Sequence, residues 1–249
     1  MKDCEDLPLK LSVLSIPSWD FLTESVSCSS LKKEEIRVYL LHSPDCPVPD
    51  CHDKFLPHVQ AHLLTQKLLS SLEGLIEDQI RLEKGPHGKP FLPNSNLSFS
   101  LTHSGEWVAA CFSREYSVGI DLEHKRLPVV SDEFTKDLAK KERLIRRFFH
   151  PLEVSAWEKL PDSLKLNWFY RYWTMKEALL KGTGTGLSVP TDNFCLVPGE
   201  NCQSAYWIAR AQEPSDPSYH NWRLCPLPLP AVPAPEILVG SLAFCPRSH

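Results

Sequence analysis

The hydrophobic residues of this chain follow a strand period in some segments and a helix period in others, in an irregular order. This order differs from the regular strand–helix alternation of a parallel sheet, so it predicts an α+β fold. A helix followed by antiparallel strands occurs on each side of a joint near residues 123–128, which predicts two α+β halves, 1–124 and 125–249. Helices are expected at residues 55–75, 131–149 and 164–184, and extended segments at 36–41, 80–92, 97–113, 116–123, 193–198, 204–212, 221–227 and 236–245.

Composition and charge argue against several classes of protein. The 249 residues are 42% hydrophobic and 23% charged, as in an ordinary globular protein, and the net charge of −4 gives no general attraction to nucleic acid. The first six residues contain three acids, where a signal peptide would begin with basic residues. No segment approaches the ~20 apolar residues that span a bilayer. These features predict a cytoplasmic protein that binds neither nucleic acid nor membranes.

Nine cysteines are scattered along the chain without a CxxC pair, as expected for reduced thiols in the cytosol. The segment HSPDCPVPDCHDKF contains His42, Cys46, Cys51 and His52. It predicts either a proline-rich surface loop or a zinc site, although its two cysteines are spaced unlike the usual close pair of zinc ligands. The proline-rich residues 226–235 are either a rigid loop between strands or a polyproline ligand for a partner.

Two acids in the segment VGIDLE would face the same way. Asp121 and Glu123 lie two residues apart on a strand, so both carboxylates emerge on one face, where they repel unless water or a cation separates them. In the helix WTMKEALLKGTG, Trp173, Glu177 and Lys181 lie four residues apart along one stripe. Glu177 and Lys181 are either a surface ion pair, which stabilises a helix by only ~0.3–0.5 kcal/mol, or part of a site with the strand acids. Three carboxylates would suit Mg²⁺, which proteins hold through carboxylate and phosphate oxygens.

Other polar residues interrupt apolar segments. Thr102, His103 and Ser104 either form a turn or supply hydroxyl and imidazole groups that hold a phosphate. Lys89, in GPHGKPFL, lies either on an ordinary hairpin or on a tight turn that places a cation beside a ligand. The glycines after Lys181 are not a Walker loop, because in that motif the glycines precede the lysine and open a helix.

Four segments resemble, in order and spacing, the motifs of one family. GKPFL, FSLTHSGEWVAACFS, VGIDLE and FYRYWTMKEALLKGTGTGLSVP are similar to those of the Sfp-type (surfactin-synthetase-activating) 4′-phosphopantetheinyl transferases. The strong likeness runs from about residue 85 to residue 190, about two-fifths of the chain. It implies a monomer with the fold of that family, a pseudo-twofold pair of similar α+β halves with the ligand cleft between them.

The resemblance also implies an activity. An enzyme of this family transfers 4′-phosphopantetheine from coenzyme A to a serine of an apo acyl or peptidyl carrier protein. The reaction requires Mg²⁺, for which Mn²⁺ can substitute. The other product is adenosine 3′,5′-bisphosphate, and the carriers serve fatty-acid, polyketide or non-ribosomal peptide biosynthesis. By position, Asp121, Glu123 and Glu177 correspond to the metal-binding acids, and Glu177 also to the group that deprotonates the acceptor serine or positions its base. Lys181 corresponds to the cation that neutralises the pyrophosphate.

The remaining motif residues are implied to bind coenzyme A. His103, with Thr102 beside it, corresponds to the contact with the nucleotide phosphates. Lys89 and Pro90 correspond to the turn that packs on the adenine.

One position departs from the family pattern. The first helix of the family commonly carries an arginine near the 3′-phosphate, with a glycine four residues later, where this chain has Ala61 and Thr65. Either the register of the helix differs, or His58, His62 or Lys67 supplies the contact.

Two other functions remain compatible with these residues. One is an inactive relative that binds coenzyme A or a carrier domain without turnover, although the intact acids and Lys181 argue against it. The other is a Mg²⁺-dependent phosphohydrolase, which would need an activated water and no carrier surface. Residues 136–147 contain six basic and two acidic residues, which predicts either a docking surface for acidic carriers or an ordinary solvated helix face.

Overall fold

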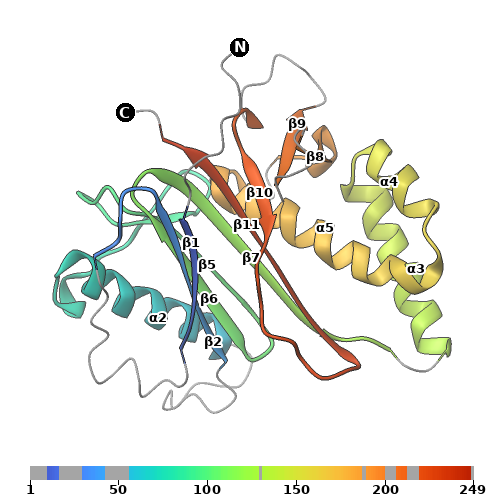
Figure 1. Cartoon of the computed structure of the whole chain (residues 1–249), viewed down its shortest axis with the longest axis horizontal. Helices are drawn as coiled ribbons and strands as arrows, with labels where there is room; N and C mark the ends of the chain where they lie inside the picture. The colour runs from blue at the N-terminus through green and yellow to red at the C-terminus, as the bar shows by residue number, and fades with distance from the viewer. Residues whose placement is uncertain are drawn as a thin grey trace.

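The computed structural model describes residues 10–16, 30–42, 56–128, 131–186, 189–199, 206–211 and 219–247. Their strands form two main sheets that pack together in the centre of the molecule. The helix α2 (Leu56–Glu73) lies on one side of the sheets. The helices α3 (Ser131–Phe148), α4 (Pro151–Glu158) and α5 (Asp162–Thr183) lie on the other (Figure 1). The expected α+β class is confirmed.

The first sheet has the strand order β1-β2-β6-β5. It consists of β1 (Lys10–Ile16), β2 (Glu35–His42), β5 (Ser98–Ser104) and β6 (Trp107–Ser113). β1 runs parallel to β2, and the other neighbours are antiparallel. Every residue of β6 is buried, because α2 covers one face of the sheet and the second sheet covers the other. This explains why the sequence of β6 is apolar throughout instead of alternating.

The second sheet has the order β7-β11-β10-β9-β8. It consists of β7 (Tyr116–Arg126), β8 (Phe194–Pro198), β9 (Trp207–Ala211), β10 (Arg223–Pro226) and β11 (Glu236–Pro246). β7 and β11 pair along their whole lengths, so β7 belongs to this sheet although it directly follows the first sheet in the chain. The division into halves at residue 124 and their pseudo-twofold relation stay predictions.

Helix α5 lies very close to β7. A Cβ atom on Gly119 would overlap the carbonyl oxygen of Ala178, so only glycine permits this approach. The helix ends at Thr183, and its C-cap Gly184 adopts the left-handed conformation at φ 75°. The close approach brings the C-terminal turns of α5 onto the face of β7 that carries Asp121.

A row of hydroxyl groups on β5 joins the two sheets. Alternate residues of β5 direct Phe99 and Leu101 towards α2 and hydroxyl side chains towards β7. A serine hydroxyl oxygen accepts a hydrogen bond from a backbone N–H of β7 in three places: Ser98 from Val118 at 3.2 Å, Ser100 from Ile120 at 3.2 Å, and Ser104 from His124 at 3.0 Å. These bonds satisfy backbone donors at the edge of β7 that have no ladder partner on that side.

A buried ion pair fixes α5 against α4 and β8. Lys176 Nζ lies 2.9 Å from a carboxylate oxygen of Glu153, and both side chains are 3% exposed. The ammonium group also donates to the carbonyl oxygens of Thr191 and Phe194, at 2.8 and 3.1 Å, and Glu153 accepts from the backbone N–H of Leu196 at 2.9 Å. All sides of the pair are therefore hydrogen-bonded to protein.

Most of the expected elements are confirmed, and four were not anticipated: β1, α4 and two short 3₁₀ helices. The interruption expected near His103 is a hairpin turn between β5 and β6. The segment 80–92 forms the short strands β3 (Glu83–Lys84) and β4 (Pro90–Phe91) around a Gly/Pro turn, and short 3₁₀ helices occur at η1 (Glu77–Gln79) and η3 (Thr191–Asn193). Within the described ranges, none of the helices has the length and hydrophobicity needed to cross a membrane.

The structure describes one residue of the first proline-rich segment and all of residues 227–235 in the second. Of the predicted loop or zinc site, only His42 lies among the described residues, where its ring stacks on Trp107 at 4.4 Å and its Nε2 lies 3.2 Å from Glu106. Cys46, Cys51 and His52 lie outside the described residues. Residues 227–235 connect β10 to β11, and Leu227, Leu229 and Val232 pack into the core between the sheets. That packing favours the reading of this segment as a rigid loop.

Candidate active site

A pocket of about 770 Å³ lies where α2, β5, β7 and α5 meet the turn before β4. It collects residues that are up to 128 positions apart in the chain, from His58 to Gly186. The residues to which the family motifs assign catalysis, coenzyme A binding or metal binding all line it: Lys89, Pro90, Thr102, His103, Asp121, Glu123, Glu177 and Lys181.

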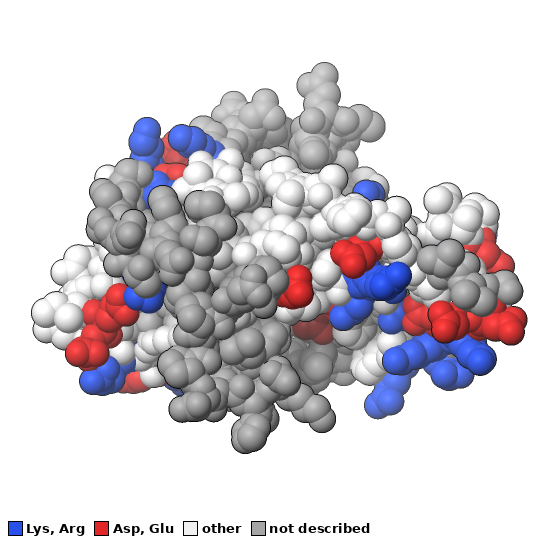
Figure 2. All heavy atoms as spheres, turned by 90° about the horizontal axis from the view of Figure 1, so that it is seen from below, with Lys and Arg blue, Asp and Glu red and all other residues white. Residues whose placement is uncertain are grey.

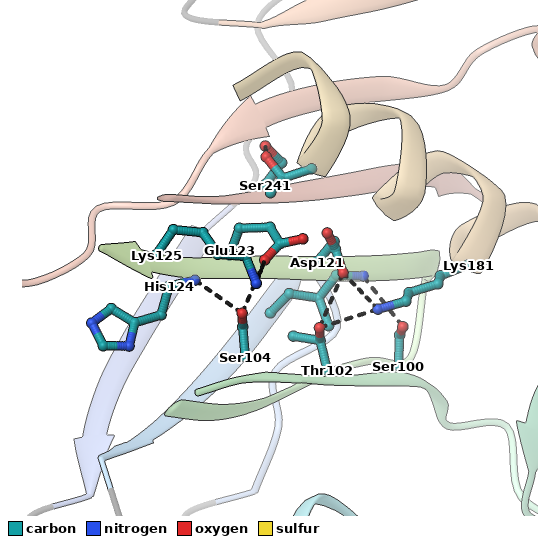
Figure 3. A network of polar contacts seen from close by, with 11 residues as sticks. Ser100, Thr102, Ser104, Asp121, Glu123, His124, Lys125, Lys181 and Ser241 are labelled. Carbon is teal, nitrogen blue, oxygen red and sulfur yellow. Dashed lines mark hydrogen bonds and ion pairs between the residues drawn. The ribbon is translucent and has the colours of Figure 1, made fainter. Parts of the chain in front are cut away.

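Asp121 lies in the wall of this pocket and has two polar partners (Figure 3). Lys181 Nζ lies 2.7 Å from Asp121 Oδ1, and the hydroxyl of Thr102 donates to the same oxygen at 3.1 Å. Thr102 in turn accepts a hydrogen bond from Lys181 at 3.1 Å. Burial raises the pKa of Asp121, and the ammonium of Lys181 opposes this rise. The three groups therefore form a closed triangle that orients the carboxylate.

Glu123 has an analogous arrangement one step along the strand. Ser104 donates to Glu123 Oε2 at 3.0 Å while its hydroxyl oxygen accepts the backbone N–H of His124. Lys125 Nζ lies 2.9 Å from the same carboxylate oxygen. Each of the two strand acids thus has one hydroxyl donor from β5 and one lysine, as Figure 3 shows.

Glu177 reaches the pocket from α5. Burial and the carboxylate of Asp121 raise the pKa of Glu177, whereas Lys181 lowers it. Asp121, Glu123 and Glu177 are thus electrostatically coupled and face a common space. In the ranges that the structure describes, no three His, Cys, Asp or Glu side chains converge closely enough to hold a metal ion. The three acids line one pocket, but Asp121 and Glu123 each form an ion pair with a lysine.

The opposite end of the pocket is lined by histidines. His58 and His62 lie one turn apart on α2, with ring centroids 4.5 Å apart, and His103 of β5 faces His58 at 5.9 Å. Lys84 also lines this pocket. Burial is the main cause that lowers the pKa of His62 and of His103, and the neighbouring His58 adds to it. The pocket therefore has a carboxylate end and an imidazole end.

Lys89 connects the turn before β4 to the second sheet. Its ammonium donates to the carbonyl oxygen of Val118 at 2.9 Å and to that of Gly182 at 2.8 Å. Burial lowers the pKa of Lys89 to about 8. A neutral amine still has two protons for two carbonyl acceptors, so this link survives loss of the charge. The predicted packing of Lys89 and Pro90 on an adenine stays a prediction.

Sequence reasoning missed three groups of residues in and around the site. Lys125 lies on the same face of β7 as Asp121 and Glu123, so strand alternation could have found it. The alternate hydroxyls of β5 carry the same period-two signal. Lys176 has no such signal, because the acid that pairs with it lies 23 residues earlier on another helix.

Comparisons with known proteins identify the family of the chain. A family model described as the 4′-phosphopantetheinyl transferase superfamily matches residues 117–224. The 4′-phosphopantetheinyl transferase HetI of Nostoc sp. is 32% identical over 170 residues, which cover 59% of this chain and 68% of HetI. The 4′-phosphopantetheinyl transferase Sfp of Bacillus subtilis is 32% identical over 148 residues, 59% of this chain and 58% of Sfp.

A vertebrate protein is also similar. The L-aminoadipate-semialdehyde dehydrogenase-phosphopantetheinyl transferase of Mus musculus is 28% identical over 139 residues, 50% of this chain and 41% of the mouse protein. The family model spans the strand with Asp121 and Glu123 and the helix with Glu177 and Lys181. The chain is therefore an enzyme of the Sfp-type 4′-phosphopantetheinyl transferase family.

Proposed function

We propose that this protein transfers 4′-phosphopantetheine from coenzyme A to a serine of an apo acyl or peptidyl carrier protein, with Mg²⁺ or Mn²⁺ as cofactor. The observation that carries the proposal is the pocket in which Asp121, Glu123 and Glu177 lie beside Lys181. Transfer from a pyrophosphate requires charge neutralisation and in-line positioning more than a covalent intermediate on the enzyme. The similarity to the 4′-phosphopantetheinyl transferases HetI and Sfp supports the same reaction.

By its chemistry, although not by its present spacing, the donor set suits a divalent cation. Asp121, Glu123 and Glu177 offer only carboxylate oxygens, which are the protein ligands that Mg²⁺ prefers. Their coupling, in which both strand acids raise the pKa of Glu177, is what a nearby cation would relieve. When bound, the metal would supply Lewis-acid neutralisation of the pyrophosphate oxygens. Thr102 and Ser104 would hold the two strand carboxylates in orientation through their hydrogen bonds.

Glu177 would accept the proton of the acceptor serine. A carboxylate whose pKa is raised is a stronger base than an ordinary glutamate. The serine oxygen forms a bond to the phosphorus that carries pantetheine, and the bond from that phosphorus to the leaving phosphate of adenosine 3′,5′-bisphosphate breaks. The ammonium of Lys181 neutralises charge on the leaving phosphate.

The histidine end of the pocket suits the phosphate groups of the nucleotide. His58 and His62 line the pocket, whereas Lys67 is paired with Glu77 at 3.1 Å and does not line it. Ala61 and Thr65, at the family's arginine and glycine positions, are fully buried in the core under α2. The two histidines are therefore the candidates to replace the family arginine, and His103 completes the group from β5.

The carrier would dock against α3. In Figure 2 basic and acidic side chains gather on the side where α3 lies in Figure 1. Lys136, Lys140, Arg143 and Arg147 are exposed on this helix and would attract an acidic carrier. Lys141 is buried, with its ammonium 5.0 and 4.8 Å from the ring centroids of Phe169 and Tyr170, so it belongs to the core. A monomeric, cytoplasmic enzyme completes the proposal, and the free thiols of the four described cysteines support a reducing compartment.

The direct test is incubation with coenzyme A, Mg²⁺ and an apo carrier domain, followed by intact-mass analysis of the carrier. Modification of the carrier and its loss on chelation would support the proposal. Asp121→Ala should reduce turnover at least ~10²-fold, the scale of losing a main electrostatic stabiliser, whereas Asp132→Ala on the exposed start of α3 should not. Coenzyme A binding without carrier modification would instead indicate a binding module, and coenzyme A hydrolysis without a carrier would indicate a phosphohydrolase.

A further inference from the structure

Both strand carboxylates of the pocket already have a cationic partner from the chain itself. Lys181 Nζ lies 2.7 Å from Asp121, and Lys125 Nζ lies 2.9 Å from Glu123 (Figure 3). Lys125 follows Glu123 by two residues on β7, so strand geometry alone puts its side chain on the same face. The pocket thus contains two ammonium groups at the acids for which a metal ion is proposed.

The two ion pairs differ in how firmly they are held. The Lys181–Asp121 pair is 33% and 9% exposed, and Thr102 bonds to both of its members. The Lys125–Glu123 pair is 43% and 19% exposed. An exposed ammonium–carboxylate pair is weak and is screened by salt. Lys125 can therefore leave Glu123 more readily than Lys181 can leave Asp121.

We propose that Lys125 is an internal counterion of the metal-free site, which occupies the cation position at Glu123 and must be displaced when the divalent metal ion binds. Three carboxylates that share one pocket repel each other, and an ammonium group at Glu123 relieves that repulsion before the metal arrives. An ammonium and a divalent cation at the same carboxylate oxygen repel each other, so the two compete. Lys125 therefore sets the metal affinity of the site, and this inference rests on the proposed function.

The test measures metal binding without turnover. Mn²⁺ is titrated into the protein with coenzyme A and no carrier, and free Mn²⁺ is followed by electron paramagnetic resonance. Lys125→Met, which keeps the apolar stem, should bind Mn²⁺ about 1.5- to 5-fold more tightly at low salt, the range of one exposed ion pair. Lys125→Arg keeps the charge and should bind like the wild type. Lys140→Met removes an exposed lysine on α3, outside the pocket lining, and controls for the loss of net positive charge.

Each result decides the inference. Tighter binding by Lys125→Met alone, with a difference that shrinks in high salt, supports it. Equal or weaker binding by Lys125→Met, or equally tighter binding by Lys140→Met, overturns it and leaves the proposed transferase function intact. If wild type and all variants fail to bind Mn²⁺ although circular dichroism shows them folded, the proposed metal site itself fails and the inference with it.

Discussion

Helix α5 carries two lysines five residues apart, and each forms an ion pair with a buried carboxylate. Lys176 and Glu153 are each 3% exposed, and backbone groups of the segment 191–196 bond to both of them. Lys181 is 33% exposed, its partner Asp121 is 9% exposed, and both lie in the pocket wall. Both pairs join an ammonium group to a carboxylate, but a ligand can reach only the pair in the pocket wall.

This difference separates a structural ion pair from a functional one. Burial lowers the pKa of Lys176, and the carboxylate of Glu153 opposes that change. A ligand cannot reach either group without unpacking α4 or β8 from α5. At Lys181, in contrast, a phosphate can approach the ammonium from the pocket while the helix stays in place. Two lysines of one motif, KEALLK, therefore have separate and testable roles.

The largest expected effect is a loss of stability when the buried pair of Lys176 and Glu153 is broken. Lys176→Met leaves Glu153 buried without its cation and should lower the free energy of unfolding by about 3–5 kcal/mol, measured by urea denaturation. The double variant Lys176→Met/Glu153→Gln should recover much of the loss, because no buried charge is left without a partner. Turnover per folded molecule at low temperature should stay near the wild-type value. If Lys176→Met lowers the free energy of unfolding by less than about 1 kcal/mol, the buried pair does not hold α5 against α4 and β8.

Breaking the pocket pair of Lys181 and Asp121 should affect activity strongly and stability little. Lys181→Met should reduce kcat/KM by about 10²- to 10³-fold, the scale for removing one preorganised electrostatic group. Its free energy of unfolding should change by less than about 1 kcal/mol, because Asp121 borders the pocket and can take up a proton, its pKa being already raised. Both quantities are measured on the same preparation. Full activity in this variant would place Lys181 among ordinary exposed lysines and erase the contrast with Lys176.

The sequence predicted the parts of this comparison that depend on local periodicity. Strand alternation placed Asp121 and Glu123 on one face, helical spacing placed Glu177 and Lys181 on one stripe, and the pocket contains all four. Local periodicity does not say what packs against a face. The partners of Lys89 are carbonyl groups 29 and 93 residues further along the chain, and a turn signal at Lys89 carries no trace of either.

The limits of sequence reasoning are clearest on α3. The charge pattern of residues 136–147 identified a basic helix, but it did not distinguish Lys141 from its neighbours. Lys141 points inwards because α3 packs on α5, where the rings of Phe169 and Tyr170 accept its ammonium. A lysine with an aromatic partner on another helix looks the same in sequence as a solvated one, so only the packing separates them.

A smaller effect is expected from pH at the histidine end of the pocket. Partial burial keeps the pKa of His62 and His103 below the ordinary value of about 6.5, and a bound phosphate raises it again. Binding then takes up protons, so affinity is greatest at pH below the pKa of the free protein and falls as pH rises through the pKa of the complex. The affinity for adenosine 3′,5′-bisphosphate should weaken up to about 10-fold between about pH 6 and 8.

The matched variant is His58→Gln/His62→Gln, which keeps His103. Calorimetry at several pH values, in buffers of different ionisation enthalpy, measures both affinity and proton uptake. The variant should show a shallower pH dependence, and comparison with it removes the contribution of the ligand's own titration. The same steep dependence in both proteins would assign the effect to the ligand or to His103 alone.

The smallest effect is expected at the exposed basic residues of α3. Lys141 is not one of them, because it is buried against α5. The double variant Lys140→Glu/Arg143→Glu reverses two exposed charges and leaves Lys141 in place, so the packing of α3 on α5 is preserved. The apparent KM for an acidic carrier should rise about 3- to 10-fold at low salt, and less at high salt because exposed charges are screened. The KM for coenzyme A and kcat at saturating carrier should stay unchanged, since steering charges act mainly on association. Lys33→Glu, an exposed lysine before β2, tests a charge change elsewhere on the surface. An equal rise in KM for both substrates would mean that the variant damages the fold, and an unchanged carrier KM at low salt would make α3 an ordinary solvated helix.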